Sequence, residues 1–150
     1  MSIKQASWVH GTSAQIENPS ALKHVTRYAF YTQLVGRKGA GTWVHFPIPT
    51  PVITDDIRLR LESAMVRFRC HSNATCIAHF HVCDGENRFL VHDHVNLVHT
   101  DWNTPFHREV VRPEHALLWG IGVTIFVEFS GNTDDENTID LAAAGCDFIV

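Results

Sequence analysis

The chain has 150 residues, of which 45% are hydrophobic and 19% charged, and its formal net charge is −4. This length suffices for one domain with a hydrophobic core, and the composition excludes a disordered chain. The acidic balance and the lack of a basic run argue against a nucleic-acid partner. Residues 1–13 show no secretory signal, and no apolar run reaches the ~18 residues of a membrane span. We therefore expect a cytoplasmic protein without a membrane partner.

Alternation of polar and apolar residues predicts β-strands throughout the first half of the chain. The strands expected there are residues 6–10, 24–35 and 42–46. The side chains expected to be buried in the second of them are Val25, Tyr28, Phe30 and Leu34. Glycines predict a turn at 36–41, and three prolines predict an extended crossing loop at 47–51.

The second half of the chain continues the β pattern. The strands expected there are residues 57–70, 77–83, 89–97, 107–113 and 115–130. The first changes its alternation near residues 62–63, which predicts a bulge. The last is apolar on both faces and includes Trp119, so we expect it to be a central strand. In residues 133–150, Thr133 and Glu136 fit a helix capping box, but an acidic loop followed by a final strand is the favoured interpretation.

Short strands separated by turn signals predict an all-β fold. We expect a single domain over residues 1–150, an antiparallel two-sheet β-sandwich of which a jelly roll would be one form. The four cysteines match no C-x-x-C metal or redox spacing. Free thiols are the preferred interpretation, although a disulfide could span the predicted turn between Cys70 and Cys76.

Histidine is unusually abundant. The chain has 11 histidines beside 12 lysines and arginines, and protonating all of them would change the formal net charge from −4 to +7. That change is centred near the ordinary histidine pKa of about 6.5. Either these side chains titrate on the surface without consequence, or the assembly or ligand affinity of the protein changes near pH 6.

Four of these histidines belong to a predicted β-hairpin. His79 and His81 alternate with apolar residues in its first strand, as His92 and His94 do in its second. The two apolar faces must coincide on the core, so an even-numbered loop places all four histidines on the opposite face. A four-residue loop would set His79 opposite His92, and a two-residue loop would set His81 opposite His92.

Imidazoles that converge across such a hairpin are metal ligands. Opposed residues have Cβ atoms about 4.5–5.5 Å apart. At that spacing, neutral histidines can bind Zn, Fe, Ni or Cu and leave a position open for water or substrate. An exposed hairpin face without a metal and a proton-sensitive interface are the alternative interpretations.

The stretch "HFHVCDGE" resembles the first half of the cupin metal motif, with His79, His81 and Glu86 in the ligand positions. This resemblance implies a jelly roll with a catalytic metal. Two glycines of the motif are replaced by Asn73 and Asp93, no second motif follows, and Glu86 falls in the predicted turn.

Pieces spread over most of the chain also resemble a family of uncharacterised bacterial all-β proteins. These pieces are "WVHGTS", "WVHFPIPTPVITDD", "HVCDGENRF", "GIGVTIFVEF" and "AAAGCDF". The resemblance implies a β fold and no particular activity.

Three functions are compatible with these patterns. The preferred one is a binding or assembly module without turnover of its own, which self-associates as a homo-oligomer and carries a histidine face that binds a metal or responds to pH. The second is a cupin-like metalloenzyme. The third is a carbohydrate or small-ligand binder that uses Trp102 and His99, with Trp43 and Trp119 in the core.

Overall fold

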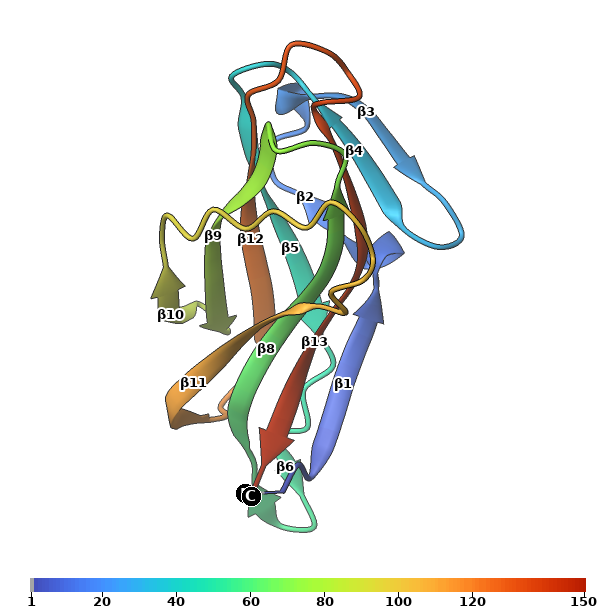
Figure 1. Cartoon of the computed structure of the whole chain (residues 1–150). Helices are drawn as coiled ribbons and strands as arrows, with labels where there is room; N and C mark the ends of the chain where they lie inside the picture. Colours follow the sequence, from blue (N-terminus) through green and yellow to red (C-terminus); the bar gives the residue numbers. More distant parts are fainter. Residues whose placement is uncertain (1) are drawn as a thin grey trace.

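The computed structural model describes residues 2–150 and consists of two antiparallel sheets packed face to face (Figure 1). Sheet A has the order β11–β8–β13–β4–β3, and β1 also pairs with β13. Its strands are β1 (Gln5–His10), β3 (Leu22–Arg27), β4 (Thr32–Gly36), β8 (Arg60–Cys70), β11 (His107–Ala116) and β13 (Thr138–Ile149).

Sheet B has the order β10–β9–β12–β5–β2. Its strands are β2 (Gln15–Ile16), β5 (Gly41–Ile48), β9 (Thr75–Asp84), β10 (Asn87–His92) and β12 (Ile121–Phe129). The remaining elements are a β6–β7 pair (Ile53–Thr54 and Ile57–Arg58) and the short 3-10 helices η1 (Gly11–Ser13) and η2 (Pro19–Ala21).

Apolar side chains from both sheets fill the space between them. β12 lies between β9 and β5 and buries alternate residues, namely Ile121, Val123, Ile125, Val127 and Phe129. Buried rings from the other strands are Phe46, Phe68, Phe80 and Phe148. The predicted antiparallel β-sandwich is confirmed, as is the central place of the strand that ends at Phe129.

The bulge predicted near residues 62–63, within the strand predicted at 57–70, is also confirmed. On β13, Asp147 pairs with Ser63 and Phe148 pairs with Leu61, which leaves Glu62 without a partner on that strand. The extra residue changes which parity faces the core, so Leu61 and Ala64 are both buried.

Trp119, expected in the core, is instead 71% exposed. The reason is the carboxylate of Asp84, which accepts hydrogen bonds from the backbone N–H groups of Leu118, Trp119 and Gly120 at 2.8, 2.8 and 3.0 Å. These bonds hold residues 118–120 in a turn, so β12 begins only at Ile121 and the indole projects outward.

The segment 24–35, predicted as one strand, is a hairpin of β3 and β4. The chain reverses where the N–H of Tyr28 donates to the carbonyl of Tyr31 at 2.9 Å. Leu34 is buried as predicted, but Val25, Tyr28 and Phe30 are 38%, 40% and 62% exposed. β3 is an edge strand at the side of the sandwich (Figure 1), and Tyr28 and Phe30 lie in the turn that follows it, where few neighbouring residues can bury them.

The proline-rich loop begins later than predicted, because β5 continues through Pro47 to Ile48. Pro47 pairs with Gly122 on β12, while β2 reaches only Val44 and His45 on the other side of β5. A proline is tolerated there because that side of the strand is an open edge.

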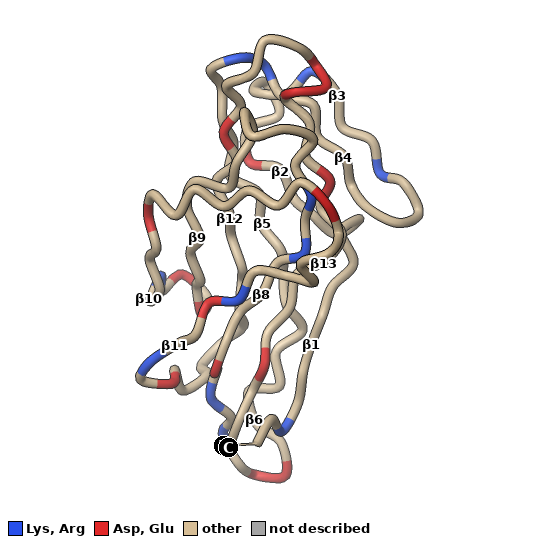
Figure 2. The backbone as a smooth tube through the Cα atoms, in the orientation of Figure 1, with Lys and Arg blue, Asp and Glu red and all other residues tan. Residues whose placement is uncertain are grey.

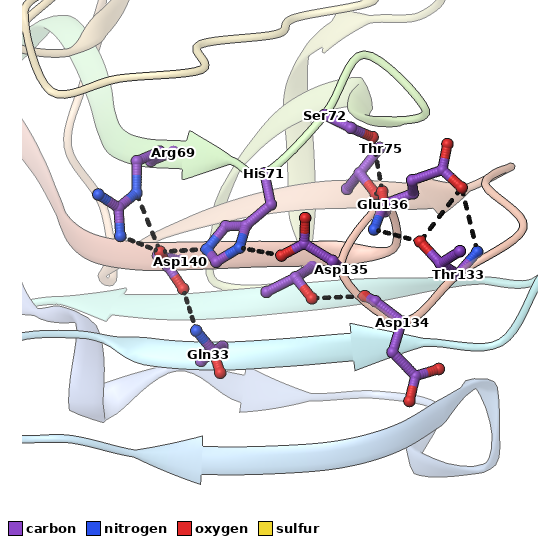
Figure 3. A network of polar contacts seen from close by, with 11 residues as sticks. Gln33, Arg69, His71, Ser72, Thr75, Thr133, Asp134, Asp135, Glu136 and Asp140 are labelled. Atoms are coloured by element: carbon purple, nitrogen blue, oxygen red, sulfur yellow. Dashed lines mark hydrogen bonds and ion pairs between the residues drawn. The ribbon is translucent and has the colours of Figure 1, made fainter.

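The C-terminal segment is an acidic turn followed by a strand, as predicted. The N–H of Thr133 donates to Glu136 Oε1 at 3.1 Å, and the N–H of Glu136 donates to Thr133 Oγ1 at 3.2 Å (Figure 3). These are the contacts of a capping box, but here they close a turn before β13.

The four cysteines are free thiols. Burial raises the pKa of Cys70 to about 12 and also raises the pKa of Cys146, so both remain protonated at neutral pH. The prediction of unpaired thiols is therefore confirmed.

Basic and acidic residues are interspersed along the chain, and Figure 2 shows no long basic stretch among residues 2–150. No helix in this part of the chain is long and apolar enough to cross a membrane.

Candidate ligand-binding site

Three of the four predicted hairpin histidines lie close together beside sheet B. His79 and His81 are on β9, and both contact the carboxylate of Asp93, at 3.2 and 2.8 Å. His94 follows Asp93, and its backbone N–H donates to Nδ1 of His79 at 3.2 Å. The hydrogen bond from His81 and the charges of the neighbouring histidines hold the pKa of Asp93 below its usual range.

The fourth, His92, is separated from the others. Arg88 pairs with Cys83, as the four-residue-loop register requires, but a bulge then shifts the pairing by one residue and His92 pairs with Phe80. A one-residue shift moves a side chain to the other face of a sheet. His92 therefore points toward sheet A and hydrogen-bonds Glu109 on β11, so the predicted common face of four histidines is wrong.

Metal binding at this hairpin stays a prediction. Among residues 2–150, no group of three or more His, Cys, Asp or Glu side chains has an arrangement that could hold a metal ion. Glu86, the third position of the cupin-like pattern, lies exposed in the turn between β9 and β10.

The connection between β10 and β11, residues 93–106, carries Trp102 and His99 to sheet A. In Figure 1 this yellow-to-gold trace runs from β10 across β8 toward β13 and turns back into β11. The carbonyl of His99 accepts a 2.6 Å hydrogen bond from the N–H of Cys70, and its ring stacks on Phe68 with 4.5 Å between ring centroids. Burial lowers the pKa of His99. His99 thus anchors the connection, whereas Trp102 reaches the surface.

Trp102 forms one wall of a cavity on the outer face of sheet A, which we call the aromatic groove. Its lining residues are Phe30, Tyr31, Arg67, Trp102 and Ala142, and its volume is about 270 Å³. The rings of Tyr31 and Trp102 stack with centroids 6.1 Å apart, and Phe30 packs edge-on against Tyr31. Ala142, the bulge residue of β13, also lines the groove.

Two arginines of β8 lie against Trp102. The guanidinium carbons of Arg67 and Arg69 are each 4.8 Å from its ring centroid, within the range of cation–π contacts. Arg69 also donates two hydrogen bonds to the fully buried carboxylate of Asp140, which His71 and Gln33 contact as well (Figure 3).

Arg67 is bonded differently from Arg69. It donates to the backbone carbonyls of Pro105 at 2.7 Å and Trp102 at 3.4 Å, and no carboxylate of residues 2–150 lies within ion-pair distance of it. The aromatic groove thus combines the exposed ring of Phe30 and the half-buried rings of Tyr31 and Trp102 with one cation, Arg67. No acidic side chain of residues 2–150 neutralises this cation.

A second cavity of about 240 Å³ lies on the outer face of sheet B, and we call it the histidine groove. Its lining residues are Glu17, Trp43, His45, His81, Cys83, Arg88 and Thr124. Most of its polar side chains bond to other side chains: His45 contacts Glu17 at 3.0 Å and also Thr124, while His81 contacts Asp93. The rings of His79, His81 and Phe126 surround Trp43.

Of the two residues predicted to bind a ligand, Trp102 is therefore at a surface cavity and His99 is not. Tyr31, Phe30 and Arg67 were not predicted. The available signal was "YAFY" at residues 28–31, where three aromatic residues fall within one turn.

The fold has counterparts among solved structures. CBM86, a low-affinity xylan-binding module from the gut symbiont Roseburia intestinalis, is similar with a TM-score of 0.52 and 6% identity, over 97% of this chain and 96% of that chain. The CBM36-1 domain of a xylanase from the hindgut metagenome of Trinervitermes trinervoides has a TM-score of 0.45 and 6% identity, over 95% and 96% of the two chains. The first likeness shows a shared β-sandwich fold. No curated protein matches by sequence.

The sequence itself matches one family along nearly its whole length. The model of DUF6623, described as a family of unknown function, matches residues 2–149. This match confirms the resemblance to an uncharacterised family of all-β proteins, and the chain belongs to the DUF6623 family.

Proposed function

We propose that the protein is a carbohydrate-binding module and that the aromatic groove is its binding site. The observation that carries the proposal is the set of three aromatic rings and an arginine around one cavity on the outer face of sheet A. Sugar rings present C–H faces that pack on aromatic rings and hydroxyl groups that need polar partners. Tyrosine and tryptophan combine an apolar body with a polar group and suit such ligands.

The dimensions and position of the groove agree with this role. Its volume of about 270 Å³ is close to the lower end of the roughly 300–1,000 Å³ usual for small-molecule sites, which fits one or two sugar residues lying on the surface. A sandwich of the same fold is a xylan-binding module in Roseburia intestinalis, so the fold is compatible with the proposal. The proposal itself rests on the groove.

A glycan panel followed by calorimetry tests the proposal. We expect wild-type protein to bind at least one soluble oligosaccharide, and Tyr31→Ala and Trp102→Ala to bind it more weakly. Trp119→Ala is the matched control because its indole is exposed in the turn before β12, outside the groove. Unchanged melting temperatures would show that the variants fold. Retained affinity in both folded groove variants would contradict the proposal.

Self-association is a second candidate function, favoured by the exposed apolar side chains of Val25, Tyr28 and Phe30 at the edge strand β3 and its turn. Edge strands with such side chains pair readily with a second copy. Sedimentation velocity at pH 7.5 and 5.5 tests it. We expect an oligomer at pH 7.5 that dissociates at pH 5.5, and a monomer for Phe30→Ser. A wild-type monomer at both pH values would rule this function out.

Metal binding by the predicted ligands His79, His81, His92 and His94 remains a separate proposal, which the arrangement of these side chains does not support. Elemental analysis of chelator-free protein, with His79→Ala/His81→Ala as the comparison, tests it. Near-stoichiometric Zn, Fe, Ni or Cu that disappears in the double variant would support a metal site. Absence of metal after adding each ion back would end it.

A further inference from the structure

We infer that the carbohydrate bound in the aromatic groove carries a carboxylate, as uronic acids do, and that Arg67 binds this carboxylate. The inference rests on the proposed function and names the ligand class of the same site. The inference follows from a comparison of two neighbouring arginines: a carboxylate occupies one edge of the Arg69 guanidinium, and the same edge of Arg67 has no partner among residues 2–150.

In Arg69, a carboxylate occupies one edge of the guanidinium group. Its Nε and Nη2 atoms form one edge of the guanidinium, and both donate to Oδ2 of Asp140, at 3.1 and 2.7 Å. This edge is a fork of two N–H groups that matches a carboxylate, and such charge-assisted pairs are among the strongest hydrogen bonds in proteins.

In Arg67, the corresponding edge of the guanidinium group has no partner among residues 2–150. Both of its hydrogen bonds use Nη1, which donates to the backbone carbonyls of Pro105 and Trp102. These bonds and the contact with the Trp102 ring fix the orientation of the guanidinium. The Nε and Nη2 edge is therefore held in place without a partner among residues 2–150, and Arg67 lines the same cavity as Tyr31 and Trp102.

The surrounding charges favour an anionic ligand over a neutral one. Arg67 is the one charged side chain that lines the groove. Asp101, the acid next to Trp102, is exposed, accepts a hydrogen bond from the N–H of Asn103 and lies beyond ion-pair distance from Arg67. A sugar carboxylate would thus supply the charge that Asp140 supplies to Arg69. A carboxylate is also a much stronger base than a sulfate ester, so its oxygens accept stronger charge-assisted hydrogen bonds from the fork.

Matched oligosaccharides test the inference. The probes are β-1,4-linked glucose oligomers, the same oligomers oxidised at C6 to glucuronate, and oligomers that carry a sulfate ester at C6. We expect wild-type protein to bind the glucuronate form about 10–100-fold more tightly than the neutral form, the effect of one charge-assisted pair. The preference should weaken with added salt.

Variants of Arg67 locate the effect. Arg67→Met keeps an apolar stem against Trp102 and is expected to bind the neutral and glucuronate oligomers equally. Arg67→Lys keeps the charge without the fork, so it should retain only part of the preference. Arg88→Met is the control, because Arg88 is an exposed arginine of the histidine groove on the other sheet.

The outcomes separate this inference from the proposed function. Equal wild-type affinity for neutral and glucuronate oligomers, or an unchanged preference in Arg67→Met, overturns the inference and leaves carbohydrate binding intact. Sulfate esters bound as tightly as glucuronate overturn the assignment to a carboxylate. Failure to bind any glycan of the panel would overturn the proposed function itself.

Discussion

The two outer faces of the sandwich carry similar residues in different states of bonding. Each has a groove of about 240–270 Å³ with a tryptophan and an arginine in its wall. In the histidine groove, Trp43 is surrounded by protein rings, and His45 and His81 bond to Glu17 and Asp93. In the aromatic groove, two backbone carbonyls hold the guanidinium of Arg67, which has no acidic partner among residues 2–150. Arg88 of the histidine groove also has no ion-pair partner in that part of the chain, but no hydrogen bond holds its guanidinium in place.

This difference teaches how to rank two candidate sites in one molecule. Polar groups that satisfy one another stabilise the fold, and a ligand would have to replace bonds that already exist. A fixed donor without a partner gains bonds when a ligand arrives. The aromatic groove is therefore the better candidate, although the histidines are the more conspicuous feature of the sequence.

The largest expected effect comes from breaking the ion pair that makes Arg69 differ from Arg67. Asp140→Ala removes a fully buried carboxylate, which leaves Arg69 without its acidic partner and His71 with Asp135 alone. Removing one member of a buried pair costs several kcal/mol, and because both partners are partly exposed we expect about 3 kcal/mol. Urea unfolding measures this. A loss below about 1 kcal/mol would mean that solvent already satisfies these groups.

The next effect compares the two tryptophans. Trp102→Ala removes a central ring of the aromatic groove and should weaken glycan binding by about 2 kcal/mol, or roughly 30-fold. Trp43→Ala should leave glycan affinity unchanged and lower the melting temperature, because its ring packs against His81 and Phe126. Calorimetry on both variants, after their melting temperatures are known, measures the contrast. The reverse result would move the binding site to sheet B.

A smaller effect concerns the pH dependence of stability. The pKa of Asp93 is lower in the folded protein than its ordinary value of 3.8, so its ionised form stabilises the fold. This contribution is complete above about pH 4 and is lost as the pH falls through the folded pKa. We expect Asp93→Asn to melt below wild type at neutral pH, and the difference to disappear as the pH falls through the lowered pKa of Asp93. A constant difference over the whole range would contradict this role of Asp93.

The smallest effect is expected at Trp119. Trp119→Ala removes the most exposed tryptophan and should change stability by less than about 0.5 kcal/mol, with no change in glycan affinity. The backbone N–H bonds to Asp84 are independent of the indole. A measurable loss of affinity would show that the ligand extends to the turn before β12.

Much of the fold could be read from the pattern of side chains. The bulge at Glu62, the central strand that ends at Phe129 and the strand after the acidic turn follow from parity, because residues two apart share one face of a strand. The predictions of buried residues were wrong where a turn or bulge changed which alternate residues face the core and no glycine or proline marked the change. The reversal at residues 28–31 exposed Phe30, and the bulge after Arg88 moved His92 to the inner face.

The sequence by itself determined the all-β class, the buried face of most strands and the free thiols, because these depend on local alternation and composition. Only the tertiary structure decided which polar groups have partners. Asp140 lies on β13, 71 residues after Arg69, and Trp102 reaches β8 through the connection that follows β10. Local sequence patterns do not predict such distant pairings. These pairings distinguish Arg69, which has an acidic partner, from Arg67, which we propose binds a ligand.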